Sequence, residues 1–166
     1  MLSIKPLTPA FAVAPRPAKG DIVGIAGAGF ATIINFQLDC ENKDLGARAE
    51  VRRAAEAAGL TYVHIPAAKH ELFTDAVIER AARTLKTAPG PVLAHCASGQ
   101  RAAIIWAAAS ARSQPVDEVL GILKAAGFDL DFLRDDLEAQ ADRARWTSGN
   151  ECGLTADLAD QALEAA

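Results

Sequence analysis

The sequence predicts an α/β protein of three layers, in which a mostly parallel sheet of four or five strands is flanked by helices. One observation indicates this class. Short apolar, β-branched runs alternate along the chain with longer segments whose apolar residues recur at helical spacing. Strands that alternate with helices form parallel sheets covered on both faces. The 166 residues, 51% of them hydrophobic, suit one domain that buries its core without disulfides or metals.

Four runs are expected to form strands. Each is short, apolar or β-branched, and bounded by Gly, Pro or polar residues. Pro66, for example, ends the run TYVHI. The expected strands are 11–15, 30–36, 61–66 and 92–95.

Helices are expected between these strands and after the last one. Segment 45–60 is rich in Ala, Glu and Arg and has Gly59 just past its end, and the apolar residues of segment 72–85 share one helical face. Pro115 opens a further helix. The remaining helices are expected within 16–29, over 102–111, over 129–146 and, as a last element, within 153–165.

The chain is expected to form one α/β domain, residues 1–145, followed by a linker and a C-terminal helix, residues 146–166. No internal repeat, low-complexity tract or second domain interrupts the first part. The polar, glycine-containing segment 146–153 is the expected joint.

Composition argues against several classes of partner. The net charge is −4 and no basic stripe is present, so nucleic acid is not expected. No apolar run approaches the roughly 20 residues that span a bilayer, so no membrane segment is expected. The N-terminus lacks the pattern of a secretory signal, and the expected location is the cytoplasm. The sequence leaves the oligomeric state open.

No cofactor and no metal are expected. The glycines of GIAGAG, 24–29, follow a helix and precede a strand, which reverses the order of a dinucleotide-binding turn. The histidines and cysteines are too scattered for a metal triad or a zinc spacing: His64, His70, His95, Cys40, Cys96 and Cys152. His64 is instead expected to be a satisfied, half-buried strand histidine. In a reducing cytoplasm a lone thiol is free for chemistry.

The stretch HCASGQR, residues 95–101, is the strongest functional signal. Cys96 directly follows the expected strand 92–95, at the carboxyl end where open α/β sheets bind ligands. The small residues after it allow backbone N–H groups to converge on an anion just before a helix begins, and an arginine adds a permanent positive charge. The predicted site is the nucleophile Cys96, supported by His95, with an anion-binding loop of Ala97, Ser98, Gly99, Gln100 and Arg101.

HCASGQR resembles the His-Cys signature of cysteine-dependent phosphatases, and more closely the Cys-x-x-Gly-x-Arg loop of single-domain rhodaneses. The whole chain resembles the beta-lactamase hydrolase-like, phosphatase-like domain family through the segments 7–13, 29–35, 38–41, 59–66 and 90–101. This resemblance covers residues 5–125 and implies a fold like that of the dual-specificity cysteine phosphatases. It also implies either phosphatase or sulfurtransferase activity.

Three departures from the phosphatase pattern favour a rhodanese-like sulfurtransferase that carries a sulfane sulfur as a Cys96 persulfide. Only four residues separate Cys96 from Arg101, and Ala102 follows where phosphatases usually have a hydroxyl. The segment AAKHE offers no aspartate as general acid, which contributes about 10²–10⁴-fold in phosphate cleavage, whereas a sulfur leaving group needs little protonation. A phosphatase remains the alternative, with Glu71 or Asp75 as its acid.

A second alternative is a non-catalytic module that binds anions. The intact Cys96 and Arg101 favour an enzyme over this module. In each case the expected ligand is a small anion, either a persulfide, thiosulfate or a phosphoester.

Charged residues near the loop are expected to support it. Lys69 could attract an anionic donor, and Asp39 and Glu41 could either orient Lys69 and Arg101 or be simply solvated. Cys40 is interpreted as a loop cysteine rather than a relay thiol.

Overall fold

The computed structural model describes residues 2–41 and 46–147. Its centre is a five-stranded sheet with the strand order β1-β2-β5-β3-β4. The first strand is antiparallel to the second, and all other neighbours are parallel. The predicted α/β class with a mostly parallel sheet is therefore confirmed. The strands are β1 (Lys5–Thr8), β2 (Phe11–Ala14), β3 (Thr32–Asn35), β4 (Thr61–His64) and β5 (Val92–His95).

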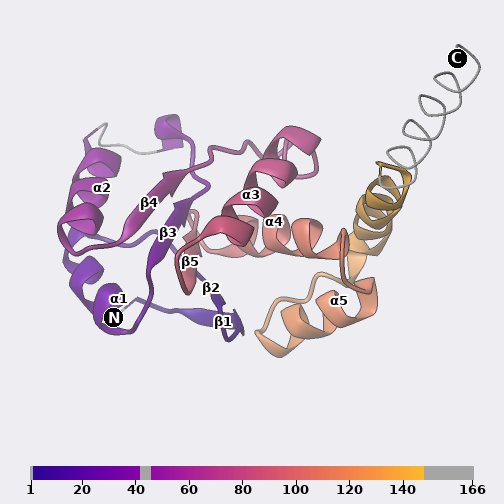
Figure 1. The fold of residues 1–166 in the computed structure, drawn as a ribbon, viewed down its shortest axis with the longest axis horizontal. Coiled ribbons are helices and arrows are strands. Elements are labelled where there is room, and N and C mark those ends of the chain that lie inside the picture. Colours follow the sequence, from indigo (N-terminus) through magenta and orange to yellow (C-terminus); the bar gives the residue numbers. More distant parts are fainter. Residues whose placement is uncertain (1, 42–45, 148–166) are drawn as a thin grey trace, which may run out of the picture.

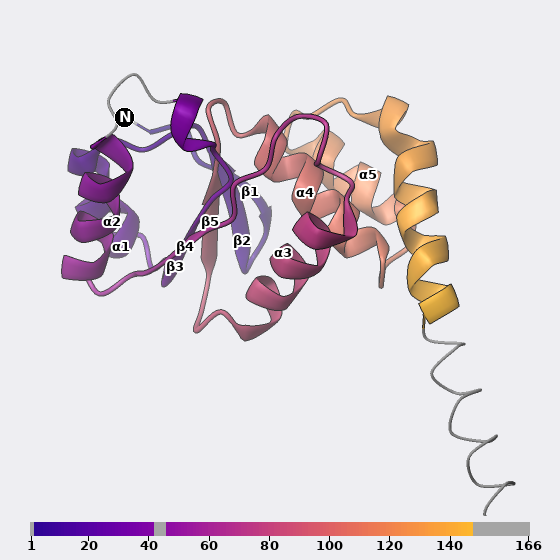
Figure 2. The same ribbon diagram turned by 90° about the horizontal axis from the view of Figure 1, so that it is seen from above.

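Helices cover both faces of this sheet (Figures 1 and 2). On one side lie α1 (Ile22–Gly27) and α2 (Ala47–Ala57). On the other lie α3 (Asp75–Thr87) and α4 (Gln100–Ala111), with α5 (Val116–Ala125) and a helix over residues 134–147 beyond them. The sequence of α4 is apolar almost all round, and this helix is accordingly buried between the sheet and the other helices. None of the helices in the described part of the chain is long and apolar enough to cross a membrane.

The register of the sheet brings the carboxyl ends of its parallel strands to one level. His95, the last residue of β5, is paired with Ala14 at the end of β2 and with Asn35 at the end of β3. Asn35 is in turn paired with His64 at the end of β4. The loops that follow these four strands therefore meet at one edge, which is where the predicted nucleophile lies.

The two sides of β5 face different cores. Leu93 packs with α1 and α2, whereas Ala94 and Cys96 pack with α3 and α4. Side chains alternate between the two faces of a strand, so His95 points to the α1 and α2 side. The side chains of the adjacent residues His95 and Cys96 thus point to opposite faces of the sheet.

Three details differ from the sequence prediction or fall outside it. The antiparallel edge strand β1 was not separated from β2, and α4 begins at Gln100 rather than at Ala102. Residues 146 and 147 continue the helix that starts at residue 134. The rest of the expected linker and the expected last helix lie outside the described residues.

Candidate active site

Cys96 lies directly after β5 and is almost completely buried, with 2% of its surface exposed. Its Sγ atom accepts a hydrogen bond from the backbone N–H of Gly99, at 3.1 Å. Within the loop, Ala97 and Ser98 are exposed, and Gly99 is buried. The structure thus holds the sulfur at the start of α4, where the unsatisfied N–H groups of a helix favour negative charge.

The shape of this loop depends on Gly99. Its φ angle is +90°, in the left-handed region that side chains rarely adopt. A Cβ atom at this position would lie 3.2 Å from the carbonyl carbon and oxygen of Ala14, because the loop is pressed against the end of β2. Gly99 therefore permits both the turn and the close approach that place its N–H on the Cys96 sulfur.

Arg101, in the first turn of α4, reaches across the edge of the sheet. Its Nη1 donates to the backbone carbonyls of Phe36 at 3.1 Å and Ala67 at 2.9 Å. The same guanidinium forms an ion pair with Glu41, with Nη1 to Oε1 at 2.8 Å and Nη2 to Oε2 at 3.1 Å. Only 10% of the Arg101 side chain is exposed. Arg101 therefore ties the Cys96 loop to the loops that follow β3 and β4.

Glu41 is held as a carboxylate by this arrangement. Burial raises the pKa of Glu41, but the hydrogen bond and the charge of Arg101 outweigh burial and place the pKa below its usual value. Hydrogen bonds from the Leu38 backbone and from Gln37 act in the same direction. Of the two roles considered for Glu41, the structure places it as the partner of Arg101.

Asp39 has a different partner from the Arg101 or Lys69 considered for it. The Asp39 carboxylate accepts a hydrogen bond from Nη2 of Arg48 in α2, at 3.1 Å. The expectation that Asp39 supports the Cys96 loop is corrected accordingly, because its carboxylate turns toward α2. Between Asp39 and Glu41, the thiol-bearing Cys40 is free and exposed. Lys69 is exposed on the loop after β4.

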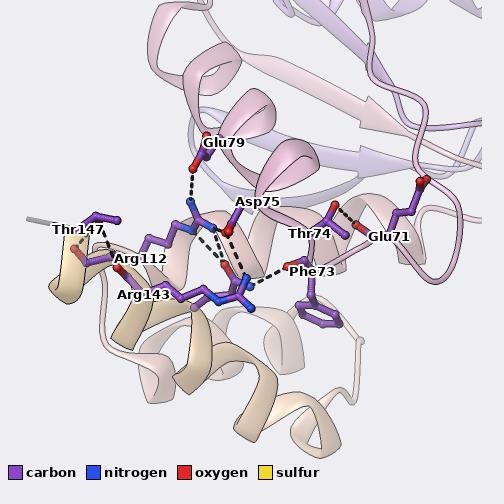
Figure 3. Close-up of polar contacts among 10 residues, drawn as sticks. Glu71, Phe73, Thr74, Asp75, Glu79, Arg112, Arg143 and Thr147 are labelled. Carbon is purple, nitrogen blue, oxygen red and sulfur yellow. Dashed lines mark hydrogen bonds and ion pairs between the residues drawn. The ribbon is translucent and has the colours of Figure 1, made fainter.

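Asp75, one of the two acids considered for a phosphatase, is bound elsewhere. It opens α3, and its carboxylate faces two arginines (Figure 3). Oδ1 lies 2.6 Å from Nη2 of Arg112 and 3.2 Å from Nη1 of Arg143. Burial raises the pKa of Asp75, but these arginines outweigh it and lower the pKa. A carboxylate held in this way is poorly suited to donate a proton at neutral pH, so the structure does not support Asp75 as the acid.

Glu71, the other candidate acid, is half-buried on the loop after β4. Its Oε2 accepts a hydrogen bond from the backbone N–H of Ala68, at 3.0 Å. This bond closes a turn of its own loop, between the carbonyl of Ala67 that binds Arg101 and the start of α3. Glu71 is therefore the carboxyl group that stays available to the phosphatase alternative.

His95 lies on the opposite face of the sheet from the Cys96 sulfur. Neither ring nitrogen has a well-formed hydrogen bond within the described chain, and the contact of His95 with the predicted loop is a weak hydrogen bond to the Cys96 backbone. Burial lowers the pKa of His95 to about 4. The positive charge of Arg16 and the nearby His64 lower this pKa further, and the hydrogen bond with the Cys96 backbone raises it. The imidazole is therefore neutral at physiological pH.

His64 behaves as the sequence predicts. Its Nε2 lies 2.8 Å from the backbone carbonyl of Gln37, and the residue is half-buried in β4. Two neighbours that sequence reasoning missed, Asn35 and Tyr62, are joined by a hydrogen bond from Nδ2 to the hydroxyl, at 2.9 Å. The sequence indicates such residues only by a polar side chain within an apolar strand, or at the end of one.

Comparison with known proteins agrees with this geometry. The family model described as "Beta-lactamase hydrolase-like protein, phosphatase-like domain" matches residues 3–113. A beta-lactamase hydrolase-like protein of Xylella fastidiosa is 32% identical over 140 residues, which cover 83% of this chain and 32% of the relative. The chain thus spans about a third of the length of this curated relative.

Solved structures with the same fold are described as phosphatases. A candidate phosphatase from Neisseria meningitidis is 29% identical, with a TM-score of 0.72 over 82% of this chain and 97% of that one. A Pseudomonas aeruginosa protein, TpbA, solved as a cysteine-to-serine variant in complex with phosphotyrosine, is 18% identical, with a TM-score of 0.60 over 89% and 90% of the chains. This second likeness concerns the fold.

The Neisseria structure and the family model support a cysteine-phosphatase-like enzyme, and they support phosphoester hydrolysis better than sulfur transfer. The match to the family model covers most of the described chain and includes the Cys96 loop. The chain belongs to the beta-lactamase hydrolase-like, phosphatase-like domain family.

Proposed function

We propose that the protein is a sulfurtransferase in which Cys96 accepts a sulfane sulfur from a small anionic donor and passes it to a nucleophilic acceptor. The observation that carries this proposal is a mismatch within the site. The nucleophile and the arginine of a cysteine phosphatase are present, but Asp75 is bound by Arg112 and Arg143. Sulfur transfer does without a strong general acid, because its leaving groups are stabilised anions.

The reaction needs no outside oxidant or reductant. With thiosulfate as donor, the Cys96 thiolate attacks the outer sulfur, an Sγ–S bond forms, the S–S bond of the donor breaks, and sulfite leaves with the electron pair. An acceptor thiolate, sulfite or cyanide then attacks the outer sulfur of the persulfide. That step breaks the Sγ–S bond and returns Cys96 as a thiolate. The loop N–H groups at the start of α4 would stabilise the persulfide anion.

The structure offers Cys96 little space, which is also consistent with transfer of a single atom. The sulfur is buried, and the Gly99 N–H approaches it to 3.1 Å. Arg101 is committed to Glu41 and to two backbone carbonyls. The SO₃ end of thiosulfate and a phosphoryl group each present three oxygens, so binding of either would need Arg101 to release part of this network. Once sulfite has left, the persulfide carries one added atom on Cys96, whereas a phosphocysteine keeps all three oxygens.

Phosphoester hydrolysis is the second candidate, and the comparisons favour it. In that reaction the Cys96 thiolate attacks phosphorus and the P–O bond to the substrate alcohol breaks. Water later attacks the phosphocysteine, which breaks the S–P bond, releases inorganic phosphate and returns Cys96 as a thiolate. The departing alkoxide needs a proton, and Glu71, whose Oε2 accepts a hydrogen bond from the Ala68 N–H, is the residue we propose as its donor.

Paired kinetic measurements test the proposal. Turnover of thiosulfate with cyanide, and of an aryl phosphate, should be measured for the wild type and for Cys96→Ser and Glu71→Gln. Sulfur transfer predicts the larger kcat/KM for thiosulfate, its loss in Cys96→Ser and its retention in Glu71→Gln. A larger kcat/KM for the phosphate that depends on Glu71 would establish the second candidate, and anion binding without turnover of either substrate would indicate a binding module.

A further inference from the structure

Gln140, in helix 134–147, is a polar residue buried in the core, with 2% of its surface exposed. Its Oε1 accepts hydrogen bonds from Nε and Nη2 of Arg112, at 3.0 and 2.8 Å. Its Nε2 donates to the backbone carbonyl of Phe73, at 3.0 Å. A guanidinium can only donate and a carbonyl can only accept, so these two partners fix the orientation of the amide. Gln140 thereby joins the end of α4 to the loop before α3.

Phe73 and Glu71 lie on one loop (Figure 3), and this loop also binds Arg101. The carbonyl of Ala67, near the start of the loop, accepts a hydrogen bond from Nη1 of Arg101, at 2.9 Å. Farther along, the loop folds into a closed turn, in which the N–H of Ala68 donates to Oε2 of Glu71 and the N–H of Glu71 donates to the Ala68 carbonyl, each at 3.0 Å. The loop is therefore tied to Arg101 at one end and to the buried amide at the other.

The amide of Gln140 occupies a position where packing alone would favour an apolar side chain. Leu137, one turn earlier on the same face of the helix, is fully buried in the apolar core. Burying a polar group costs free energy unless it is hydrogen-bonded, so the hydrogen bonds of Gln140 explain its presence better than packing does. Gln140 also lies outside residues 3–113, which the family model matches, so this link is additional to the part that the family model covers.

We propose that Gln140 is a positioning residue for the active site. By holding Phe73 it fixes the loop, and the Ala67 carbonyl in turn orients the Arg101 guanidinium toward an anion bound at the Cys96 loop. Gln140 touches no substrate, so its effect should fall on anion binding rather than on the attack by Cys96. This inference rests on the proposed function only in that Arg101 binds the anion, a role that thiosulfate and a phosphoester share.

Gln140→Glu and Gln140→Met test this role. The glutamate keeps an acceptor for Arg112 but, as a carboxylate, has no N–H for the Phe73 carbonyl, and the methionine removes the amide without adding a charge. We expect both variants to raise KM for thiosulfate about threefold to tenfold, the effect of one lost hydrogen bond, and to change kcat by less than about twofold. Asp75→Asn is the matched control, because the Asp75 carboxylate also binds Arg112 but, as an acceptor, cannot bond the Phe73 carbonyl. Its KM should stay that of the wild type.

Sulfate binding measures the same effect without any turnover. In amide NMR titrations of the full chain with sodium sulfate, following residues 97–101, we expect the dissociation constant to be about threefold to tenfold higher in both Gln140 variants than in the wild type and in Asp75→Asn. If this difference appears although thiosulfate is not turned over, the proposed function fails and the role of Gln140 stands. Unchanged sulfate affinity in both variants, a change confined to the charged Gln140→Glu, an equal change in Asp75→Asn, or no sulfate binding by the wild type would each overturn the role of Gln140.

Discussion

Glu41 and Arg101 are sixty residues apart in the chain and form a two-point ion pair, with Nη1 to Oε1 at 2.8 Å and Nη2 to Oε2 at 3.1 Å. This pair joins the loop after β3 to the first turn of α4, beside the candidate nucleophile. A planar guanidinium and a carboxylate bonded at two points fix each other's orientation, which one contact would not do. The position of Arg101 relative to Cys96 therefore depends on Glu41.

Glu41→Gln should destabilise the protein and lower catalytic efficiency. The change leaves a largely buried guanidinium without its anion, and we expect a loss of about 2 kcal/mol in the free energy of unfolding. Because its pKa is lowered in the fold, Glu41 stabilises the protein above its unfolded value of 4.5, and this contribution disappears as pH falls through the folded pKa. Urea denaturation at several pH values measures the loss of stability and its pH dependence, and kcat/KM for thiosulfate measures the catalytic effect.

Asp39→Asn is the matched control for that variant. The Asp39 carboxylate pairs with Arg48 and is 54% exposed, so its removal should cost well under the Glu41 effect. Equal losses for Asp39→Asn and Glu41→Gln would contradict the role assigned to the pair with Arg101.

Gly99→Ala should damage the loop more than an ordinary glycine substitution does. Left-handed backbone costs a non-glycine residue about 1–3 kcal/mol, and at Gly99 the new Cβ would also lie 3.2 Å from the Ala14 carbonyl group. Gly59→Ala is the control, because its φ is also positive, at +78°, but nothing lies within 4 Å of the added atom. We expect Gly99→Ala to be the less stable variant and to lose turnover, whereas Gly59→Ala keeps it.

His95 should make the protein less stable as the solution is acidified. Its folded pKa is about 4, against 6.5 for the free group, so between these values the unfolded chain takes up a proton that the folded protein does not. The unfolding free energy of the wild type should therefore fall by about 3 kcal/mol relative to His95→Gln between pH 6.5 and 4. The exposed His70, changed to Gln, serves as control. Parallel pH profiles for the wild type and His95→Gln would show that this prediction is wrong.

Asp75→Asn should affect stability and leave turnover unchanged. Asp75 joins α3 to Arg112, whose guanidinium also donates to Oε1 of Gln140 in helix 134–147. Since the carboxylate is 56% exposed, we expect a loss of about 1 kcal/mol or less in the free energy of unfolding. A tenfold or greater fall in kcat on either substrate class would instead assign Asp75 to the chemistry.

Much of the fold could be predicted because its local signals agree with its tertiary structure. The β5 run carries buried side chains on both faces of the sheet. Pro115 lies directly before α5, and Gly59, with its positive φ, lies just past the end of α2. The edge strand β1 was missed for a physical reason. Its four residues include Pro6 and bury only Leu7, so the sequence carries no alternating pattern, and pairing with β2 creates the strand.

The site was predictable only in part. The loop from Cys96 to Arg101 is contiguous, so its spacing in the sequence indicates a shared function. Glu41 rather than Asp39 is the partner of Arg101 because of the direction in which each side chain points from the short helical turn Asp39–Glu41. Spacing alone does not encode that direction. The buried position of His95 likewise follows from the sheet register, which only the folded chain defines.

Mass spectrometry of the peptide that carries Cys96 tests the central proposal most directly. After incubation of the full chain with thiosulfate, we expect one added sulfur atom on that peptide, its removal by cyanide, and no equivalent adduct on the peptide with the exposed Cys40. In Cys96→Ser the adduct should be absent. A phosphoryl group on Cys96 after incubation with an aryl phosphate, together with no sulfur adduct after thiosulfate, would contradict sulfur transfer and establish the protein as a phosphatase.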